Sequence, residues 1–389
     1  MNAALNPTPP PPSPAGLTLR PATLTDLDAL VRIEAQCFES DRLSRRSFRY
    51  MLTKGHAATL IAEFDGTAVG YVMVLFSRGT SMARIYSIAV LAAFRRHTVA
   101  QALVAEAEAV AQREDRAEMR LEIRRDNPAS IGLFTRLGYE SFGLVSDYYE
   151  DHMDAVRYQK SLAPQLGLDM VRVPFYAQTA EFTCGPATLM MAMAAHEPTM
   201  ILDRKLELRL WREATTVFMT SGHGGCGPYG LSLAAWQRGF SVEVYVNAEG
   251  ALFLDSVRNP AKKEVMRLVQ DDMLDEMQTA QIPLYQQAVG PDKLEAMFGR
   301  GGIPLVLISS YRIYKEKFPH WVVVTGFDQR FVYMHDPYID VREGETLADC
   351  INMPVLRRDF AAMARYGRSN LKAVVVIYPQ RRRSESRRA

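Results

Sequence analysis

The chain has 389 residues, of which 48% are hydrophobic and 23% are charged, as in an ordinary globular protein. A chain of this length favours two domains over one. The formal net charge of +2 gives no reason to expect nucleic acid or an anionic membrane as a partner, and the longest apolar runs are strand-sized, too short to span a bilayer.

The two ends of the chain are predicted to be disordered. Residues 1–16 form a proline-rich leader that lacks the basic start and apolar stretch of a secretory signal. Residues 380–389 form a short basic tail, interpreted as a solvated end in preference to a binding arm. The four cysteines lie far apart with no Cys-x-x-Cys pair, which argues against a disulfide framework or a metal site. We therefore expect a cytoplasmic protein with reduced thiols.

Residues 17–163 alternate strand and helix patterns. The segment "LTLRPAT" predicts a strand, and "LTDLDALVRIEAQCF" predicts a helix capped by Thr23 or Thr25. The segment "ATLIAEFDGTAVGYVMVLF" predicts two strands joined by a tight turn at Asp65–Gly66. The strand "RIYSIAV", an alanine-rich helix, the strand "MRLEIRR" and a helix closed by Gly138 follow. This alternation predicts an α/β domain.

Three segments of this domain, "YSIAV…FRRHTVAQAL", "RLEIRRDNPASIGLFTRLGYE" and "SDYYEDHMDAV", resemble the GNAT acetyltransferases, most closely their ribosomal-protein alanine N-acetyltransferase branch. The resemblance covers nearly all of residues 17–163. It implies a mixed central sheet, acetyl-CoA as the cofactor, and an amine or N-terminus as the acetyl acceptor.

Acetyl transfer needs backbone N–H groups at a helix N-terminus to hold the cofactor's pyrophosphate. The resemblance implies an acetyl-CoA site built from Ile88, Val90, Arg95, Arg96, His97, Thr98, Val99, Ala100 and Asn127. Thr98 stands where the family has a glycine, and its β-carbon crowds a backbone that must approach phosphate closely. The sequence therefore leaves open whether this domain transfers acetyl groups or only binds a substrate or partner.

Glu122 matches the general base of the family. Its alternative interpretation is an exposed strand carboxylate in a charge ladder with Arg120 and Arg124. Phe134 occupies the position of the family's proton-donating tyrosine and has no proton to give, and either of the tyrosines at 148 and 149 is a candidate substitute.

A second domain is predicted at 170–379, after a linker at 164–169. Its methionine-rich middle, residues 187–300, is interpreted as helical. The strands "IPLVLISS", "HWVVVTGF", "FVYMHD" and "AVVVIYP" follow. Helices followed by a mostly antiparallel sheet give an α+β layout.

Cys184 and Cys226 both precede Gly-Pro, a sequence that suits the first turn of a helix. A helix N-terminus stabilises a thiolate. Gln178 stands six residues before Cys184 and can donate to an oxyanion. Cys226 lies in a glycine-rich loop without such a glutamine, although His223 is nearby. Cys184 is therefore the preferred nucleophile, and Cys226 is the alternative.

The base for Cys184 must come from a distant part of the chain. His320 begins "HWVVVTGF", the turn "DQR" follows, and "FVYMHDP" returns with Asp336 at its far end. Residues equidistant from a hairpin turn lie opposite each other, so we expect His320 and Asp336 to be cross-strand neighbours, as a catalytic triad requires. His335 is expected to face away, because adjacent strand residues point to opposite faces.

Gln178, Cys184, His320 and Asp336, in this order, resemble the bacteriocin-processing double-glycine cysteine peptidases, which have a papain-like fold. The resemblance covers residues 170–379. It implies that Cys184 attacks a peptide carbonyl, His320 moves the proton, Asp336 orients His320, and Gln178 holds the oxyanion. It also implies a leader peptide cut after Gly-Gly as the substrate, with no metal or other cofactor.

Three alternatives stay open at this point. In the first, the protein is an acetyltransferase that modifies a peptide or protein N-terminus, and the thiol domain is accessory. In the second, both domains are pseudoenzyme binding modules. In the third, the acyl-thiol intermediate passes to an acceptor other than water. The sequence predicts no oligomeric state.

Overall fold

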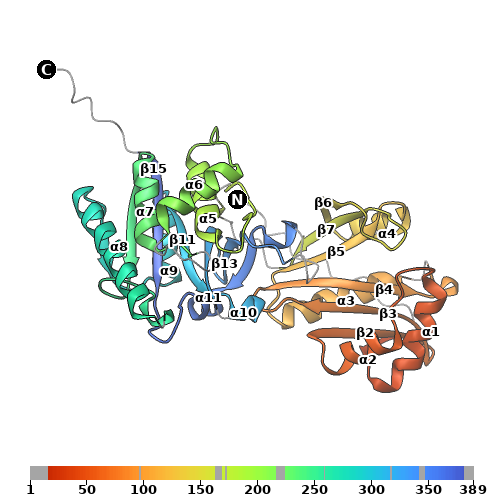
Figure 1. Cartoon of the computed structure of the whole chain (residues 1–389). Coiled ribbons are helices and arrows are strands. Elements are labelled where there is room, and N and C mark those ends of the chain that lie inside the picture. Colours follow the sequence, from red (N-terminus) through yellow and green to blue (C-terminus); the bar gives the residue numbers. More distant parts are fainter. Residues whose placement is uncertain are drawn as a thin grey trace. The chain divides into compact units, whose positions relative to one another are not determined.

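The computed structural model describes residues 16–95, 98–162, 169–170, 173–215, 224–257, 259–315, 318–340 and 347–380. The chain divides into two compact units, Met1–Gln165 and Leu166–Ala389 (Figure 1). The predicted leader lies outside the described residues except for Gly16, and the predicted tail lies outside them except for Gln380.

The first unit alternates strands and helices. Its strands are β1 (Leu17–Pro21), β2 (Ala57–Phe64), β3 (Thr67–Phe76), β4 (Met82–Val90), β5 (Glu118–Arg124), β6 (Glu140–Val145) and β7 (Ala155–Ser161). Its helices are α1 (Leu27–Cys37), α2 (Arg45–Thr53), α3 (Val99–Arg113) and α4 (Pro128–Arg136), with short 3-10 turns at Leu24–Asp26 and Ala92–Phe94.

The strands form one sheet in the order β1-β2-β3-β4-β5-β7-β6. Every neighbouring pair is antiparallel except β4 and β5, so the predicted mixed sheet is confirmed. The predicted turn at Asp65–Gly66 joins β2 to β3, with both residues at positive φ (48° and 77°). The two parallel strands pair only over Met82–Arg84 and Glu118–Arg120, which leaves the rest of the facing edges unpaired with each other.

Both faces of this sheet are covered. Tyr71 and Met73 of β3 pack with α1 and α2, whereas Val72 and Val74 pack with α3. This alternation follows from the two-residue period of a strand, since successive side chains point to opposite faces. The apolar run "GYVMVLF" is therefore a strand buried on both sides.

The second unit contains a second sheet and most of the remaining helices. Its strands are β8 (Asp169–Met170), β9 (Phe240–Val246), β10 (Leu284–Gln286), β11 (Ile303–Ser309), β12 (Pro319–Phe327), β13 (Phe331–His335), β14 (Met353–Leu356) and β15 (Ala373–Gln380). Its helices are α5 (Cys184–His196), α6 (Arg204–Ala214), α7 (Pro228–Gln237), α8 (Pro260–Thr279), α9 (Pro291–Gly299), α10 (Tyr311–Tyr314) and α11 (Arg357–Met363), with short 3-10 turns at Leu254–Ser256 and Leu347–Cys350.

The strands run in the order β10-β9-β15-β11-β12-β13-β14, and β8 pairs with β12. All described pairs are antiparallel except β9 with β10, which confirms the α+β layout. The interpretation of residues 187–300 as helical throughout is wrong, because β9 and β10 lie within them. The segment "FSVEVYV" places Phe240, Val242 and Val244 on one face of β9, a two-residue period that the methionine-rich surroundings obscure.

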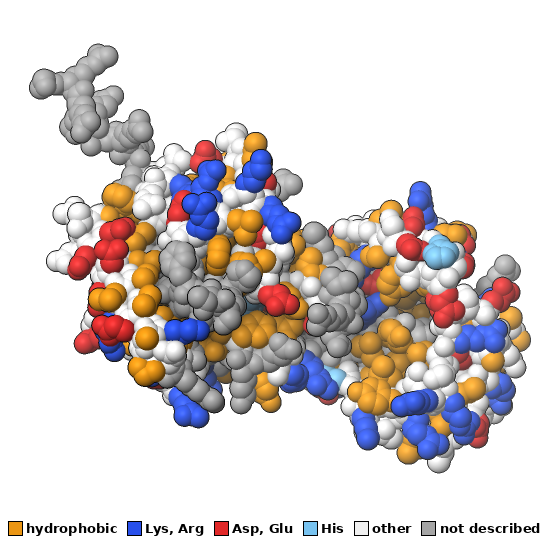
Figure 2. Space-filling model, viewed as in Figure 1, with side chains coloured by type: hydrophobic (Ala, Val, Ile, Leu, Met, Phe, Trp, Pro, Cys, Tyr) orange, Lys and Arg blue, Asp and Glu red, His pale blue; other side chains and the backbone are white. Residues whose placement is uncertain are grey.

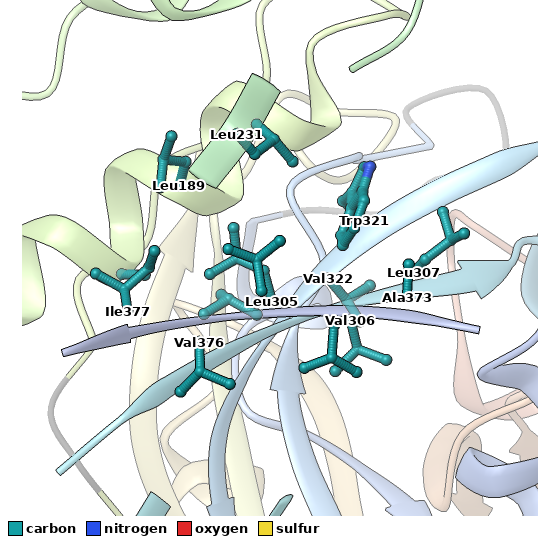
Figure 3. Packing of buried hydrophobic residues seen from close by; sticks show 14 of the residues in the cluster. Leu189, Leu231, Leu305, Val306, Leu307, Trp321, Val322, Ala373, Val376 and Ile377 are labelled. Atoms are coloured by element: carbon teal, nitrogen blue, oxygen red, sulfur yellow. The ribbon is translucent and has the colours of Figure 1, made fainter. Parts of the chain in front are cut away.

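The middle of this sheet is buried on both faces, as continuous apolar strands require. Figure 3 shows Leu305 and Ile377 on the side of Leu189 and Leu231, which belong to α5 and α7. Val376, the neighbour of Ile377 along β15, points to the opposite side. Helix α5 therefore lies centrally on one face, which fixes the position of its first residue, Cys184.

No helix within the described ranges combines the length and apolar character that crossing a bilayer requires. Figure 2 shows acidic, basic and apolar side chains reaching the drawn face of each unit.

Candidate active sites

Cys184 is the first residue of α5. Pro186 stands in the first turn of the helix, where a missing N–H costs nothing. The thiol-bearing residue is only 8% exposed, and the helix behind it is buried from Cys184 to Ala194. The buried helix therefore holds the thiol in a defined position at its N-terminus.

His320 and Asp336 are in direct contact, as predicted. Nε2 of His320 lies 2.6 Å from Oδ1 of Asp336, and the two residues are 1% and 0% exposed. The pair is diagonal rather than directly opposite. Val323 of β12 faces His335 of β13, so a continued register places Asp336 opposite Val322, two residues from His320 and on the same face. The hairpin contains a bulge between Val324 and Gly326, which equal counting from the turn does not anticipate.

The charges around His320 favour its protonated form. Burial lowers the pKa of the ring, but the Asp336 carboxylate and, to a smaller extent, the thiol of Cys184 oppose this effect and raise the pKa to about 10. Helix α5 packs against β12, which carries His320, and the Cys184 thiol is close enough to the ring to raise its pKa. Cys184, His320 and Asp336, which are remote in the chain, thus meet in one buried cluster.

Aromatic side chains surround this cluster. The Tyr314 hydroxyl donates to Oδ2 of Asp336 at 2.8 Å, and the Tyr338 N–H donates to Oδ1 at 2.9 Å. The rings of Tyr314 and Phe318 stand edge-on to His320, with centroids 6.1 and 6.0 Å away. Both carboxylate oxygens are therefore satisfied, and the imidazole is held in one orientation.

His335 takes no part in the cluster, as predicted. Its Nε2 lies 3.0 Å from the carbonyl of Val173, and its Nδ1 accepts the N–H of Asn352 at 2.9 Å. Burial lowers the pKa of His335 to about 4, so the ring is neutral and structural.

Gln178 is anchored beside Asp336. Its N–H donates to the carbonyl of Pro337 at 2.8 Å, and its side-chain Nε2 donates to the carbonyl of Ala180 at 2.9 Å. An amide nitrogen has two hydrogens, so this bond leaves one for another acceptor. Oε1 is buried without a hydrogen-bond partner.

Cys226 forms part of the wall behind Cys184. It pairs with Thr215 in an isolated bridge, and its carbonyl accepts the indole N–H of Trp321 at 3.0 Å. Burial, and then the neighbouring Cys184, raises the pKa of Cys226 well above its ordinary value. A β-carbon at Gly185 would lie 3.2 Å from Cβ of Cys226, so the glycine allows the loop to approach α5 closely. His223 lies outside the described residues.

In the first unit, several of the predicted acetyl-CoA residues lie on β4 or at the start of α3. Ile88 and Val90 lie on the part of β4 that does not pair with β5, and the Arg95 Nε donates to the carbonyl of Val90 at 3.2 Å. Val99 and Ala100 begin α3. The residues at 96 and 97 lie outside the described ranges.

Thr98 adopts a left-handed backbone conformation, with φ 60° and ψ 3°. Glycine enters this region without strain, whereas a residue with a β-carbon pays a penalty there. Thr98 makes no capping hydrogen bond to α3, so its side chain does not compete for the first N–H groups of the helix. A helix N-terminus of this kind can hold a pyrophosphate, and the β-carbon of Thr98 adds bulk beside it.

Glu122 is buried between two arginines. Its carboxylate lies 2.6 Å from Nη2 of Arg84 and 3.0 Å from Nε of Arg157. The alternative interpretation of Glu122 as an exposed carboxylate is wrong, since its side chain is 5% exposed. Arg120 contacts Glu118, and Arg124 contacts Asp126 and Asp151.

Of the remaining predicted residues, Phe134 and Asn127 have structural roles, and Tyr148 lies close to Glu122. Phe134 is buried in the core against Tyr139. The side chain of Asn127 caps α4 by accepting the N–H of Ser130 at 3.1 Å. The Tyr148 hydroxyl accepts a hydrogen bond from Arg84, which also binds Glu122. Of the two candidate tyrosines, the one at 148 is thus linked to the buried carboxylate.

Residues 173–378 match the Peptidase_C39 like family, over slightly more than half of the chain. The chain belongs to the Peptidase_C39 like family. Residues 27–139 match the acetyltransferase (GNAT) family. Both resemblances expected from the sequence are confirmed, and the first unit is a GNAT domain.

Several acetyltransferases are similar to this GNAT domain. An N-alpha-acetyltransferase of Sulfurisphaera tokodaii is 31% identical over 148 residues, which are 35% of this chain and 88% of that protein. An N-alpha-acetyltransferase of Saccharolobus solfataricus is 29% identical over 150 residues, 36% of this chain and 89% of that protein. The crystal structure of the Escherichia coli ribosomal-protein-S18-alanine N-acetyltransferase is 21% identical, covers 39% of this chain and 97% of its own, and has a TM-score of 0.36.

Two residues near the candidate site of the Peptidase_C39 like region were not found from the sequence. Tyr314 lies in the connection between β11 and β12, where no periodic pattern marks it. Glu207 lies on α6 at helical spacing from the buried Leu210 and Ala214. An acid on the apolar face of an amphipathic helix is a readable signal, since such a face normally excludes charge.

The four cysteines, Cys37, Cys184, Cys226 and Cys350, are free thiols. No group of three or more His, Cys, Asp or Glu side chains within the described ranges is arranged to hold a metal ion.

Proposed function

We propose that the Peptidase_C39 like unit is a cysteine peptidase that cuts a peptide through Cys184, His320 and Asp336. The observation that carries the proposal is the buried 2.6 Å contact between His320 and Asp336 with the Cys184 thiol beside the same ring. A triad needs a nucleophile, a base and a group that orients the base, and these three residues offer those roles.

The reaction divides into two steps. The Cys184 sulfur bonds to the peptide carbonyl carbon, and the carbonyl electrons move to oxygen, where the Cys184 N–H and the second Nε2 hydrogen of Gln178 donate. The C–N bond then breaks, and the His320 imidazolium gives its proton to the leaving amine. In the second step water attacks the thioester carbon while His320 takes one of its protons, and the C–S bond breaks to release the carboxylic acid and restore the thiolate and the imidazolium.

The narrow access to the thiol supports a small residue at the cut. Because Cys184 is only 8% exposed and aromatic rings stand around His320, a segment without large side chains approaches best. A leader peptide ending in Gly-Gly meets this requirement. The cytoplasmic location and the absence of nucleic-acid and membrane partners remain predictions from the sequence.

The test is covalent capture by an acetylated peptide aldehyde that ends in Gly-Gly. Its carbonyl carbon bonds to the active sulfur and its oxygen takes the proton, giving a hemithioacetal. We expect the adduct in the unmodified protein and in Cys226→Ala, and none in Cys184→Ala. An adduct that persists in Cys184→Ala and vanishes in Cys226→Ala would overturn the assignment. Mass spectrometry of a cleaved Gly-Gly peptide, with and without an added amine, separates hydrolysis from transfer.

A second function concerns the GNAT domain. We propose that it binds acetyl-CoA and acetylates the N-terminal amine of a peptide or protein. The support is the 31% identity to an N-alpha-acetyltransferase of which the chain covers 88%, together with the unpaired edge of β4 beside the N-terminus of α3.

Bound acetyl-CoA would supply the acetyl thioester. The N–H groups of Val99 and Ala100 would hold its pyrophosphate. Glu122 is engaged by Arg84 and Arg157, so accepting a proton from the amine requires one of these contacts to open. Calorimetry with acetyl-CoA tests the proposal. No heat of binding at millimolar cofactor would leave this domain a binding module without enzymatic activity.

A further inference from the structure

Glu207 is a fully buried acid that the proposed mechanism does not use. It lies on α6, is 0% exposed, and packs against the helix that begins at Cys184. None of the described lysines, arginines and histidines forms an ion pair with Glu207. A buried carboxylate without a cation is costly, and it is kept only where hydrogen bonds compensate the lost hydration.

Four donors supply this compensation, and all come from the segment that precedes the candidate nucleophile. Oε1 accepts the N–H of Thr179 at 2.8 Å and the hydroxyl of Thr183 at 2.5 Å. Oε2 accepts the hydroxyl of Thr179 at 2.6 Å and that of Tyr176 at 3.1 Å. Each carboxylate oxygen of Glu207 thus has two hydrogen-bond partners.

These bonds restrain the residue after Gln178 and the residue before Cys184, the two residues proposed to donate to the oxyanion. Thr179 directly follows Gln178, whose own N–H is held by the carbonyl of Pro337. Thr183 directly precedes Cys184 and is fully buried. The backbone of Gln178 is thus held between the residue after Asp336 and the carboxylate on α6.

We propose that Glu207 is a positioning residue, which holds the Gln178 amide and the first N–H groups of α5 where the oxyanion forms. This inference rests on the proposed peptidase function. It assigns Glu207 no contact with the substrate. Its effect should therefore be seen in steps that build an oxyanion and be absent from steps that need only the thiolate.

Two reagents separate these steps. Iodoacetamide alkylates the thiolate by displacing iodide at carbon, and no oxyanion develops. The acetylated Gly-Gly aldehyde places negative charge on oxygen while the S–C bond forms, and it needs the oxyanion donors. Loss of one such donor in a protease lowers the rate about 100-fold to 1,000-fold. A misplaced donor should cost at least about 10-fold by the same reasoning.

The experiment compares Glu207→Gln, Gln178→Ala and the double variant in the full chain. We expect Glu207→Gln to slow aldehyde capture at least about 10-fold while alkylation of Cys184 by iodoacetamide stays within about twofold. The double variant should lose less than the product of the two single losses, because Glu207 acts partly through Gln178 and residues that act through each other are not additive. Glu213→Gln is the matched control, since Glu213 lies on the same helix and pairs with Arg238 at the surface.

Three outcomes decide the inference. Equal loss of both reactivities in Glu207→Gln, or an additive double variant, would show a general structural role and overturn it. If Glu207→Gln does not fold, Glu207→Asp replaces it, because aspartate keeps a carboxylate at this position. The thermal midpoint of Glu207→Asp and its rates of aldehyde capture and of alkylation give the same comparison. Aldehyde capture that survives in Cys184→Ala would instead refute the peptidase function itself, which keeps the two failures distinct.

Discussion

His320 and His335 are both buried in one sheet, on the neighbouring strands β12 and β13, yet their rings meet opposite electrostatic conditions. His320 contacts the carboxylate of Asp336, and its pKa is raised to about 10. His335 forms hydrogen bonds to backbone groups and packs against the edge of Phe175, and burial lowers its pKa to about 4. Two histidines one strand apart should therefore make pH-dependent contributions to stability of opposite sign.

The sign follows from the ordinary histidine pKa of 6.5. For His320 the folded pKa is the higher one, so its stabilisation is complete below pH 6.5 and is lost as the pH rises through about 10. For His335 the folded pKa is the lower one, so its stabilisation is complete above pH 6.5 and is lost as the pH falls through about 4.

Urea unfolding of His320→Gln and His335→Gln measures these contributions. All three tryptophans, Trp211, Trp236 and Trp321, belong to the second unit, so indole fluorescence follows that unit. The difference in unfolding free energy between the unmodified protein and His320→Gln should shrink from pH 7 to pH 10. The difference for His335→Gln should shrink from pH 7 to pH 4. A difference for His320→Gln that grows with pH would contradict the assigned ion pair.

Tyr314 should tune the reactivity of the candidate triad through Asp336. Removing its hydroxyl in Tyr314→Phe takes one hydrogen bond from Oδ2, and Asp336→Asn removes the charge that raises the pKa of His320. We expect the alkaline limb of peptide cleavage to move to lower pH in Asp336→Asn, whereas Tyr314→Phe keeps the carboxylate charge and should not lower it. A hydrogen bond to a charged group contributes about 1.5–3 kcal/mol, so cleavage by Tyr314→Phe should fall about 10-fold or more.

Tyr311→Phe is the control, because the exposed Tyr311 lies on the same short helix. Cleavage rates measured from pH 6 to pH 11 give the comparison. An unchanged alkaline limb in Asp336→Asn would show that the carboxylate does not set the protonation of His320.

Glu122 should contribute to the stability of the GNAT domain whether or not it also serves as a base. Glu122→Gln removes the carboxylate charge that contacts the buried Arg157, and breaking a buried ion pair costs about 3–5 kcal/mol. Hydrogen exchange of β5 and β7 should therefore accelerate strongly in this variant. Glu106→Gln removes an exposed pair with Arg113 and should change exchange little. Equal protection in the two variants would refute a structural role for Glu122.

The sequence was informative where local spacing determines contact. The hairpin that brings His320 to Asp336 spans only sixteen residues, so counting along the chain suffices to pair them, even though the bulge shifts the register. The turn at Asp65–Gly66 and the helix behind Cys184 follow from equally local signals.

Contacts between distant elements could not be read from the sequence. Glu122 pairs with Arg84 and Arg157 because β4 and β7 flank β5, an order that spacing along one strand does not contain. Glu207 and Tyr314 reach the candidate site from α6 and from a connection, through packing that only the folded chain defines.

Thr98 offers a direct test of the acetyl-CoA site. Its left-handed backbone costs a residue with a β-carbon about 1–2 kcal/mol, and in the proposed acetyl-CoA site the β-carbon of Thr98 would crowd the pyrophosphate. Thr98→Gly should therefore stabilise the GNAT domain by about 1 kcal/mol and tighten acetyl-CoA binding by up to about 10-fold, measured by calorimetry.

Asp115→Gly separates the two effects of that substitution. Asp115 also has a positive φ, 55°, but it follows the C-terminal end of α3, about 20 Å from the first turn of that helix. Its replacement should relieve backbone strain without changing cofactor affinity. If Thr98→Gly and Asp115→Gly altered acetyl-CoA binding equally, or if Thr98→Gly weakened it, the N-terminus of α3 would not be the pyrophosphate site. A gain confined to Thr98→Gly places the cofactor at that turn, because only there do strain relief and phosphate access coincide.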